Sequence, residues 1–505
     1  MSAPFEADWL KRWNLYSPQS VAIQDADSGK SFTYQQLFET SNRLAHYLKN
    51  HYQIEKGDRV AALSMNELEY VALFFATQRL GAILVPINFR LTAREVAHIL
   101  SDSEAKLLIH QRQFAGVVEQ IRQSEPKAMP KALMYFDGAD SLASVCESRS
   151  LPSDLHPMDD VTMETPCMIL YTSGTTGAPK GAVITQGMIF WNSVNTTLRL
   201  NLSQSDATLS FLPFFHTGGW NVLTTPFLHR GARVILLKKF DPDRILKLCE
   251  TEKVSILFGV PTMLDMMKHS PLFKQVDLSS VRYAIVGGEP MPMDLIRTWQ
   301  DRGIPVRQGF GLTEFGPNVF SLNEEHSTQK IGSIGFPNFY IDAKIVDETG
   351  KDLGAEEIGE LVLRGPMCTP GYWKNPEATA QTIRDGWLHT GDLVRRDAEG
   401  FYYVVGRKKD MYISGGENVY PAEIEQFLRT HPSIREVAVI GVQDEKWGEV
   451  GKAFIVTHSG EPIETAELTT FCQSNLAKYK IPKHFAFLSE LPKGDSGKIL
   501  KRALR

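Results

Sequence analysis

The stretch Tyr171–Gly181, which reads YTSGTTGAPKG, combines the residue types that bind a polyphosphate. Phosphate binding needs convergent hydrogen-bond donors and a positive charge, which backbone N–H groups beside glycine, hydroxyl groups and a lysine ammonium supply. The stretch follows the apolar run Met168–Leu170, so a strand is expected to lead into it. It is not a P-loop, because Pro179 stands where that motif has glycine. The expected phosphate-binding residues are Thr172, Ser173, Gly174, Thr175, Thr176, Gly177 and Lys180.

Three further segments place a charged side chain in a glycine-containing context. Gly309–Glu314 (GFGLTE) carries Phe310, whose ring can stack on a purine, and ends in a carboxylate suited to Mg²⁺. Trp387–Asp392 (WLHTGD) ends in a carboxylate that can accept hydrogen bonds from two ribose hydroxyls. Pro492–Lys498 (PKGDSGK) ends in a lysine, whose ammonium can offset the negative charge that builds on a phosphate under attack.

In combination these segments resemble the adenylate-forming superfamily, which contains acyl-CoA synthetases, luciferases and peptide-synthetase adenylation domains. Gly406–Asp410 (GRKKD) resembles the hinge of that family, and Ser414–Glu425 (SGGENVYPAEIE) resembles the segment after the hinge. The matching motifs keep the family's order from Tyr171 to Lys498, and the overall resemblance covers essentially the whole chain. The VYPAEIE stretch and Gly441–Glu449 (GVQDEKWGE) resemble bacterial fatty-acyl-CoA ligases.

The resemblance implies a reaction in two halves. A small carboxylic acid attacks MgATP to give an acyl-adenylate and pyrophosphate, and coenzyme A then displaces AMP. Lys498 is implied as the catalytic lysine of the first half, while Thr172 shares the Mg²⁺ ion with Glu314. A small domain is implied to turn about Lys409 between the halves. The further nucleotide contacts that the resemblance implies are Gly288, Glu289 (through its backbone), Pro290, Gln308, Gly309, Phe310, Gly311, Thr313, Asp392 and Arg407.

The acid substrate is expected in an apolar pocket. The implied residues include no cation that could pair with a second carboxylate, which favours a hydrophobic monocarboxylic acid over malonate-like or amino-acid substrates. His216 is a catalytic candidate in PFFHTGGW, although a histidine in an apolar loop is often structural. The implied acyl and coenzyme A pocket consists of His216, Trp220, Val286, Gly287, Gly311, Phe315, Gly316, Val319, Ser414, Gly415 and Gly416.

A medium- or long-chain fatty acid is the expected substrate, and an aryl acid of the cinnamate or benzoate type is the alternative. Two other functions stay open. One is loading of the acyl group onto a carrier protein, expected as a separate chain. The other is a luciferase-like monooxygenase or a non-catalytic nucleotide-binding relative. A degenerate relative would be expected to lose Glu314 or Lys498, and both are present.

The middle of the chain contains the elements that would position these residues. Strand-like stretches alternate there with helix-like ones, which predicts parallel strands in a doubly wound sheet with ligands at the carboxyl ends of the strands. The glycine turns at 287–288 and 309–311 fall at such ends. The expected strands are 253–260, 281–286 and 305–308, and the expected helices are 262–268 and 293–302.

The last hundred residues predict a separate, compact α+β domain. Its expected helices are 421–429 and 467–476, and its expected strands are 436–442, 452–456 and 484–488. We therefore expect a large N-terminal α/β domain with doubly wound, mostly parallel sheets, followed by a small mobile C-terminal α+β domain. The boundaries are 1–406 and 407–505, with the hinge at 407–410.

The amino-acid composition excludes several other classes of protein. The 505 residues are 43% hydrophobic and 22% charged, as in globular proteins with two to four domains. With 54 Lys+Arg against 59 Asp+Glu, the chain has no basic field for nucleic acid. Five scattered cysteines without a CxxC pattern argue against a disulfide scaffold or zinc site. No apolar run reaches the roughly 18 residues of a transmembrane helix, and no secretory leader is evident. A cytoplasmic enzyme is expected; weak association with a membrane surface and a homodimer stay open.

Overall fold

The computed structural model describes residues 8–148, 150–153, 160–172, 179–288, 291–473, 475–494 and 499–504. The chain divides into two compact units. The first unit contains residues 1–331, 335–342 and 363–388, and the second contains residues 332–334, 343–362 and 389–505. The hinge expected at 407–410 lies within the second unit, and the domain boundary at residue 406 stays a prediction.

One sheet of the first unit carries the strands on either side of the expected phosphate loop. It consists of β3 (Arg59–Leu63), β4 (Ile83–Pro86), β5 (Leu107–His110), β6 (Ala132–Tyr135), β7 (Pro166–Thr172) and β8 (Lys180–Thr185). The strand order is β6-β5-β3-β4-β7-β8. Every neighbouring pair is parallel except β7 with β8. The phosphate loop therefore connects two antiparallel strands at one edge of a parallel sheet.

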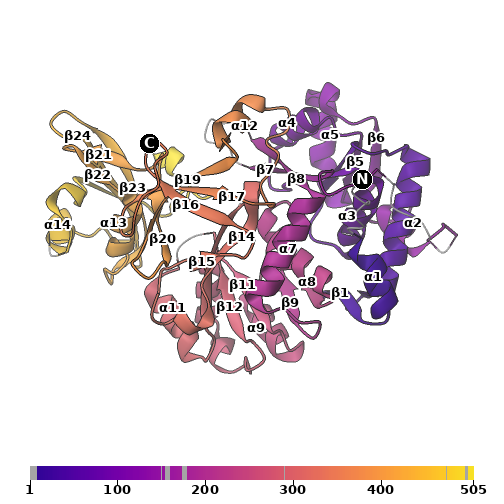
Figure 1. The fold of residues 1–505 in the computed structure, drawn as a ribbon, viewed down its shortest axis with the longest axis horizontal. Coiled ribbons are helices and arrows are strands. Elements are labelled where there is room, and N and C mark those ends of the chain that lie inside the picture. Colours follow the sequence, from indigo (N-terminus) through magenta and orange to yellow (C-terminus); the bar gives the residue numbers. More distant parts are fainter. Residues whose placement is uncertain are drawn as a thin grey trace. The chain divides into compact units, whose positions relative to one another are not determined.

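A nine-stranded sheet is the larger sheet of the first unit (Figure 1). Its strands are β1 (Val21–Asp25), β2 (Ser31–Thr33), β9 (Ala207–Ser210), β10 (Arg233–Leu236), β11 (Ile256–Gly259), β12 (Tyr283–Val286), β13 (Val306–Leu312), β14 (Gly316–Ser321) and β15 (Phe336–Pro337). The order is β15-β14-β13-β12-β11-β9-β10-β1-β2. The six strands from β13 to β1 are parallel, and antiparallel pairs lie at both edges.

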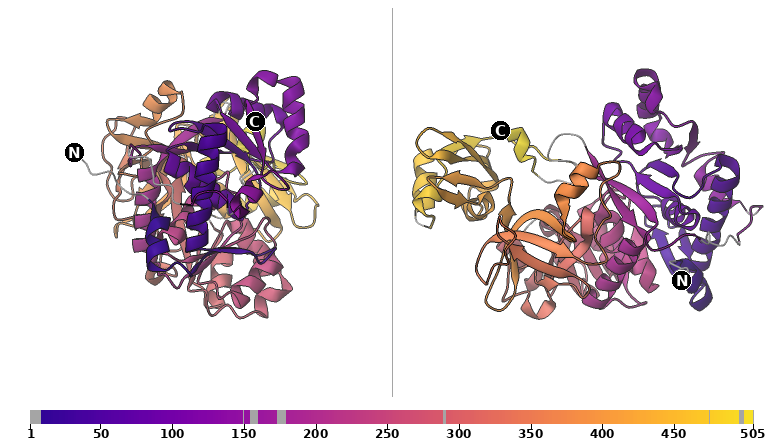
Figure 2. Two further views of the ribbon diagram at one scale, coloured as in Figure 1. Left: turned by 90° about the vertical axis from the view of Figure 1, so that its right-hand side faces the viewer. Right: turned by 45° about the horizontal axis from the view of Figure 1, so that its top comes forward.

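Helices connect these strands and cover the sheets. Figure 2 shows the helices of the first 150 residues, indigo to purple, lying beside the strands of the six-stranded sheet. The helices of the first unit are α1 (Trp9–Tyr16), α2 (Tyr34–Tyr52), α3 (Leu68–Leu80), α4 (Ala93–Ser103), α5 (Ala115–Ser124), α6 (Leu142–Glu147), α7 (Gln186–Leu200), α8 (Thr224–Arg230), α9 (Pro242–Thr251), α10 (Pro261–His269), α11 (Met293–Asp301) and α12 (Pro376–Thr382).

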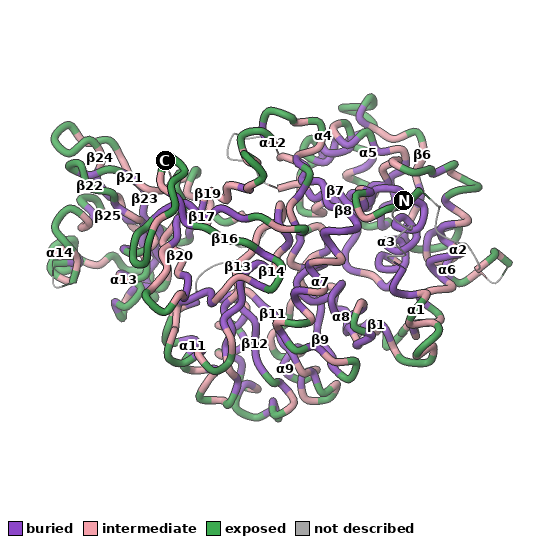
Figure 3. The backbone as a smooth tube through the Cα atoms, viewed as in Figure 1, coloured by how far each residue is buried: buried purple, intermediate pink, exposed green. Residues whose placement is uncertain are grey.

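The central strands β9, β11 and β12 of the nine-stranded sheet are buried along their whole length (Figure 3). In β12, Ala284 and Val286 pack in one cluster with side chains of α9, α10 and α11. Tyr283 and Ile285 point to the opposite face and pack in a second cluster with α2, α3, α7 and α8. That second cluster also contains Leu84 of the six-stranded sheet, so these helices fill the space between the two sheets. The expected doubly wound, mostly parallel α/β architecture is confirmed.

The remaining elements include two five-stranded sheets. The first has the order β16-β17-β19-β18 with β20 paired to β19, and the second has the order β22-β21-β24-β23 with β25 paired to β24. The second sheet and the helices α13 and α14 share one hydrophobic core in the second unit, which confirms the expected α+β class. The elements are β16 (Asp342–Val346), β17 (Gly359–Arg364), β18 (Ile383–Arg384), β19 (Trp387–Arg396), β20 (Tyr402–Arg407), β21 (Tyr412–Ser414), β22 (Glu417–Val419), α13 (Pro421–Leu428), β23 (Ile434–Asp444), β24 (Gly448–Thr457), α14 (Thr465–Gln473) and β25 (His484–Phe487).

Within the described parts of the chain, no helix is both long enough and apolar enough to cross a bilayer.

Candidate active site

Strands β7 and β8 hold the two ends of the expected phosphate loop. Thr172 ends β7 and Lys180 begins β8, and the two residues are register partners. The Thr172 Oγ1 hydroxyl donates a hydrogen bond to the backbone carbonyl of Lys180 at 3.4 Å. The structure therefore brings a hydroxyl and a lysine together at the mouth of the loop. Ser173, Gly174, Thr175, Thr176 and Gly177 lie outside the described residues.

Tyr372 links Lys180 to Glu314, the expected magnesium ligand. Glu314 lies in a 3₁₀ turn (Thr313–Phe315) that begins at Thr313. The Tyr372 hydroxyl donates to Glu314 Oε1 at 2.9 Å, and Lys180 Nζ lies 5.5 Å from the centroid of the Tyr372 ring. Burial and the neighbouring Glu314 carboxylate raise the pKa of the Tyr372 hydroxyl, so it stays protonated and donates at neutral pH. Three side chains from distant parts of the sequence thus form one cluster.

Backbone hydrogen bonds fix the segment that carries Tyr372. The Thr369 N–H donates to the carbonyl oxygen of Glu314 at 2.8 Å. The Trp373 N–H donates to the carbonyl oxygen of Gly181, in β8, at 2.7 Å. The segment is therefore bonded on one side to β8 and on the other to the turn that holds the carboxylate, which sets the position of the Tyr372 hydroxyl.

The expected adenine and magnesium segment folds into an antiparallel hairpin. Gly309, Phe310 and Gly311 lie in β13, which pairs with β14. The Phe310 ring packs edge to face on Phe320, with 6.0 Å between the ring centroids. A Cβ atom on Gly311 would lie 1.9 Å from the carbonyl oxygen of Pro317, so the hairpin closes this tightly only around glycine.

Two further glycines expected at the site, Gly287 and Gly288, lie where β12 ends. Gly287 directly follows β12, and Gly288 has a φ of +89°, a conformation that favours glycine. In the neighbouring β13, the buried Gln308 side chain accepts a hydrogen bond from the Met291 N–H at 2.9 Å. These positions share the carboxyl edge of the sheet, as expected for a ligand site. Glu289 and Pro290 lie outside the described residues.

The loop that carries His216 is fixed by Asn66. The Asn66 amide donates to the Leu212 carbonyl at 2.9 Å and accepts from the Phe214 N–H at 3.0 Å. The exposed His216 ring accepts a hydrogen bond at Nδ1 from the Gly218 N–H at 3.0 Å. An accepting Nδ1 assigns the proton of the neutral ring to Nε2. His216 is thus arranged to donate through Nε2.

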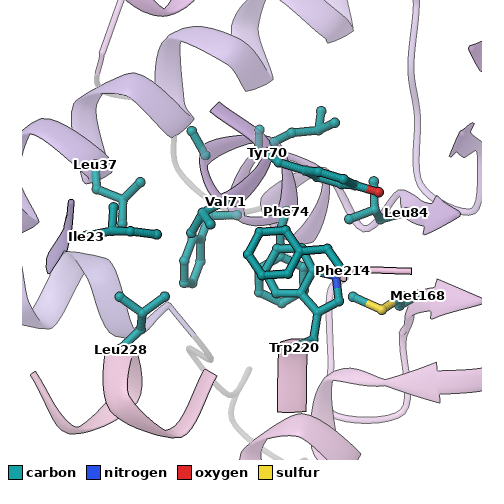
Figure 4. Close-up of a cluster of buried hydrophobic side chains, with 14 of the residues drawn as sticks. Ile23, Leu37, Tyr70, Val71, Phe74, Leu84, Met168, Phe214, Trp220 and Leu228 are labelled. Carbon is teal, nitrogen blue, oxygen red and sulfur yellow. The ribbon is translucent and has the colours of Figure 1, made fainter. Parts of the chain in front are cut away.

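Several side chains expected in the acyl pocket belong to the hydrophobic core. Trp220 and Phe315 are fully buried, at 0% exposure, and Val286 is buried as well. Trp220 stacks on Phe214 with 4.1 Å between the ring centroids (Figure 4). Its Nε1 has no hydrogen-bond partner within the described residues. Gly316 begins β14 with a φ of +77°. That these residues contact the substrate stays a prediction.

A narrow cavity opens beside the His216 loop. It encloses about 220 Å³ of empty space, counting the part open to solvent. Ser210, at the carboxyl end of β9, and Phe258, near that of β11, place it at the sheet edge where parallel α/β sheets bind ligands. Gly218 and Gly219 of the PFFHTGGW segment line the cavity. The other lining residues, which were not expected as site residues, are Leu209, Ser210, Phe211, Leu212, Leu223, Thr224 and Phe258.

In the second unit, the expected ribose ligand pairs with the expected nucleotide-binding arginine. Asp392 in β19 and Arg407 in β20 are register partners, and Arg407 Nε lies 2.6 Å from Asp392 Oδ1. Asp392 is buried, whereas the Arg407 side chain is 49% exposed. Lys409 lies two residues further on and is exposed. A buried carboxylate is thus held by a cation that reaches solvent.

The segment after the hinge forms a two-residue turn. Ser414 and Glu417 close the hairpin of β21 and β22, and Gly415 and Gly416 have φ values of +60° and +88°. A tight hairpin turn with positive φ at both central residues suits glycine. The Gly415 N–H donates to the Trp447 carbonyl at 2.9 Å, and a Cβ on Gly415 would lie 2.7 Å from the Trp447 ring. Both the turn and the indole therefore require glycine at 415.

The sequence analysis missed three residues that the structure places at these sites. Tyr372 bonds to a carboxylate 58 positions away, and Asn66 bonds to a loop 146 and 148 positions away. No local pattern signals such contacts. Ser210 is a polar residue at the end of the strand β9, which reads ATLS. Lys498, expected to act in the first half-reaction, lies outside the described residues.

Comparisons with known proteins agree with this fold. A family model described as AMP-binding enzyme matches residues 10–373, and one described as AMP-binding enzyme C-terminal domain matches residues 423–498. A feruloyl-CoA synthase of Amycolatopsis sp is 41% identical over 98% of both chains. An indoleacetate–CoA ligase of Aromatoleum aromaticum is 38% identical over 99% of this chain and 97% of its own. The solved Mycobacterium tuberculosis fatty acyl CoA synthetase is 36% identical, covers 99% of this chain and 97% of its own, and has a TM-score of 0.80.

The two family models and the full-length relatives identify the chain as an adenylate-forming enzyme. The chain belongs to the AMP-binding enzyme family. It is an AMP-forming ligase that joins an acid to the thiol of coenzyme A by way of an adenylate.

Proposed function

We propose that this ligase activates an aryl acid, of the cinnamate or aryl-acetate type, to its coenzyme A thioester. The observation that carries the proposal is the identity, 41% and 38% over almost the whole chain, to a feruloyl-CoA synthase and an indoleacetate–CoA ligase. The sequence analysis expected a medium- or long-chain fatty acid and kept an aryl acid as the alternative. The relatives support the alternative better.

Within the first unit, we assign the triphosphate to Thr172, Lys180 and the loop between them. Glu314 and Thr172 would hold Mg²⁺. The donor set fits this ion, because Mg²⁺ takes few protein ligands and completes its shell with phosphate oxygens and water. When bound, the ion would neutralise charge on the phosphates.

The other roles follow the same proposal. Phe310 offers a ring for the adenine to stack on, and Asp392 accepts from the ribose hydroxyls. Lys498 offsets the charge that develops on the α-phosphate when the acid attacks. Rotation about Lys409 then exchanges Lys498 for the Ser414–Gly416 turn. His216 Nε2 donates at the acyl site.

A cytoplasmic location is part of the proposal. Cys146, Cys167, Cys249, Cys368 and Cys472 are all free thiols, as is usual in a reducing compartment.

The test is pyrophosphate release with MgATP and coenzyme A across a panel of acids. The panel contains cinnamate, 4-coumarate, ferulate, benzoate, indole-3-acetate, malonate and saturated C4 to C18 fatty acids. The highest kcat/KM is expected for an aryl acid, with turnover that requires coenzyme A. A maximum among the longer fatty acids would contradict the aryl assignment and leave the ligase class intact.

A fatty acid is the second candidate, because the solved fatty acyl CoA synthetase is 36% identical over almost the full length of both chains. Chain length separates the two candidates. A fatty-acid enzyme would show kcat/KM rising with each added methylene up to the depth of its pocket, by a few-fold per methylene. Turnover that appears only after a carrier protein is added would instead identify a loading enzyme.

A further inference from the structure

Ser210 and Thr224 are two buried hydroxyl residues on the wall of the narrow cavity. Ser210, 6% exposed, ends β9, and Thr224, 2% exposed, begins α8. In β9, Ala207 and Leu209 point into the core formed with α9, α10 and α11. Side chains alternate along a strand, so Ser210 points to the other face, where α8 lies. Parallel strands buried on both faces are normally apolar, which makes a serine here a departure.

The hydrogen bonds around the pair fix which atom donates. The Thr224 hydroxyl donates to the Gly219 carbonyl at 2.7 Å. Ser210 Oγ and Thr224 Oγ1 lie 3.0 Å apart. Because a hydroxyl has one hydrogen and Thr224 gives its own to Gly219, Ser210 is the donor to Thr224. Ser210 Oγ then has lone pairs but no hydrogen left, and the described residues supply it with no other donor.

The cavity adjoins the residues expected around the acid. Gly218 lines the cavity and bonds to His216 Nδ1. Phe258 also lines it, and its ring lies 3.9 Å from the Cβ position of Gly287. Among the lining residues, only Ser210 and Thr224 have polar side chains. A buried acceptor that lacks a donor can orient a ligand that carries a hydrogen-bond donor.

We propose that Ser210 accepts a hydrogen bond from a ring hydroxyl of the acid and so makes the enzyme prefer hydroxylated aryl acids. This inference rests on the proposed function. A phenolic O–H supplies the missing donor. An unsubstituted ring leaves the buried acceptor unpaired, and a methoxy oxygen brings a second acceptor with no hydrogen. Ser210 acts on selectivity and takes no part in bond making.

The experiment compares kcat/KM for a matched series of acids: cinnamate, its 2-, 3- and 4-hydroxy derivatives and 4-methoxycinnamate. The series is measured on the full-length wild type, Ser210→Ala and Ser210→Cys. The cysteine variant keeps the side chain close in size while replacing the oxygen with a weak acceptor. Thr208→Val is the matched control, since Thr208 is buried on the same face of β9 and its hydroxyl donates to the Ile256 carbonyl at 2.9 Å. Thr208 is not part of the cavity wall.

In the wild type, the best hydroxycinnamate is expected to exceed cinnamate by about tenfold in kcat/KM, with no such gain for 4-methoxycinnamate. Ser210→Ala and Ser210→Cys should bring that ratio close to one, mainly by lowering kcat/KM for the hydroxylated acid. Thr208→Val should keep the ratio even where total activity falls, since a ratio within one enzyme cancels losses of folded protein.

Two results would overturn the inference. One is a wild-type enzyme that turns over aryl acids without preferring a hydroxyl. The other is a preference that survives in both Ser210 variants. Failure of the proposed function looks different: no aryl acid is turned over while a fatty acid is, and this outcome overturns both.

Discussion

The two units hold their expected site residues in different ways. In the first unit, Lys180, Tyr372 and Glu314 are joined side chain to side chain, and backbone hydrogen bonds fix the segment between them. In the second unit, a single ion pair joins the half-exposed Arg407 to Asp392, and the Gly415–Gly416 turn depends on local backbone conformation. A network of this kind sets geometry before substrate arrives, whereas exposed charges and glycine turns suit groups that are delivered by movement. Substitutions in the first unit should therefore affect stability and both half-reactions, whereas substitutions in the second unit should slow one half-reaction at a time.

The largest expected effect is that of Lys498→Ala in the second unit. Formation of acyl-adenylate from acid and ATP should fall by about 100-fold or more, because charge on the α-phosphate loses its cation. Thioester formation from supplied acyl-AMP and coenzyme A should be largely kept. The two half-reactions are measured separately, by pyrophosphate release and by thioester yield. Equal losses in both would refute the assignment of this lysine to one half-reaction and, with it, the contrast between the units.

Gly311→Ala tests how tightly the first unit is packed. A Cβ at this position would lie 1.9 Å from the Pro317 carbonyl oxygen, so the β13–β14 hairpin must open. We expect the free energy of unfolding to fall by about 3 kcal/mol, the upper part of the range for overpacking. Gly406→Ala in the second unit is the matched control, since no atom lies within 4 Å of its Cβ position. Urea unfolding of both variants measures the difference, and equal destabilisation would contradict the packing contrast.

His229, in the first unit, should make the stability of the protein depend on pH. Burial, and to a lesser extent Arg230, lowers the pKa of His229 to about 4, and the ring stacks on Trp9 at 4.2 Å between centroids. The unfolded chain, with a histidine pKa of about 6.5, binds the proton more readily, so stability falls as the pH falls from about 6.5 to 4. Protonation of His229 alone should lower the free energy of unfolding by up to about 3 kcal/mol over this pH range.

Unfolding in urea at pH 7 and pH 4.5 measures that term. His229→Phe should remove this part of the pH dependence while keeping a ring beside Trp9. His484→Gln, at an exposed histidine of the second unit, is the control and should keep the dependence. If the free energy of unfolding depends on pH as strongly in His229→Phe as in the wild type, other titrating groups cause the dependence.

Much of the fold could be predicted from the sequence, because apolar periodicity reports burial directly. The strand expected at 281–286 is β12, and the helix expected at 421–429 is α13, each to within two residues. The contacts within the site could not be predicted in the same way. Tyr372 lies in a segment with no charged neighbour on either side, and its role depends on how that segment bonds to β8. Contacts between residues far apart in the sequence are set by sheet topology, which the local pattern does not encode.

For Ser210, the residue type could be seen in the sequence but its hydrogen bonding could not. Its polarity in the ATLS strand was visible in the sequence. The direction of its hydrogen bond was not, because that depends on Thr224 and the Gly219 carbonyl in the following turn.

The smallest expected effect comes from Tyr372→Phe, which removes one hydroxyl from the first unit's network. The ring stays beside Lys180, while Glu314 Oε1 loses a donor that now lies 2.9 Å away. A hydrogen bond to a charged group contributes about 1.5 kcal/mol, so kcat/KM for ATP should fall about tenfold. The Mg²⁺ concentration needed for half-maximal rate should rise, because the carboxylate is no longer held in one orientation.

The Mg²⁺ dependence separates positioning from mere stability. Tyr403→Phe is the matched control, since its phenol donates to the Asp397 carboxylate at 3.3 Å in the second unit, away from the expected metal ligands. That variant should keep the wild-type Mg²⁺ curve. If Tyr372→Phe lowers the rate at every Mg²⁺ concentration by the same factor, Tyr372 supports the fold without orienting Glu314. A shifted Mg²⁺ curve with an unchanged denaturation midpoint would instead show that the first unit's network acts on the carboxylate itself.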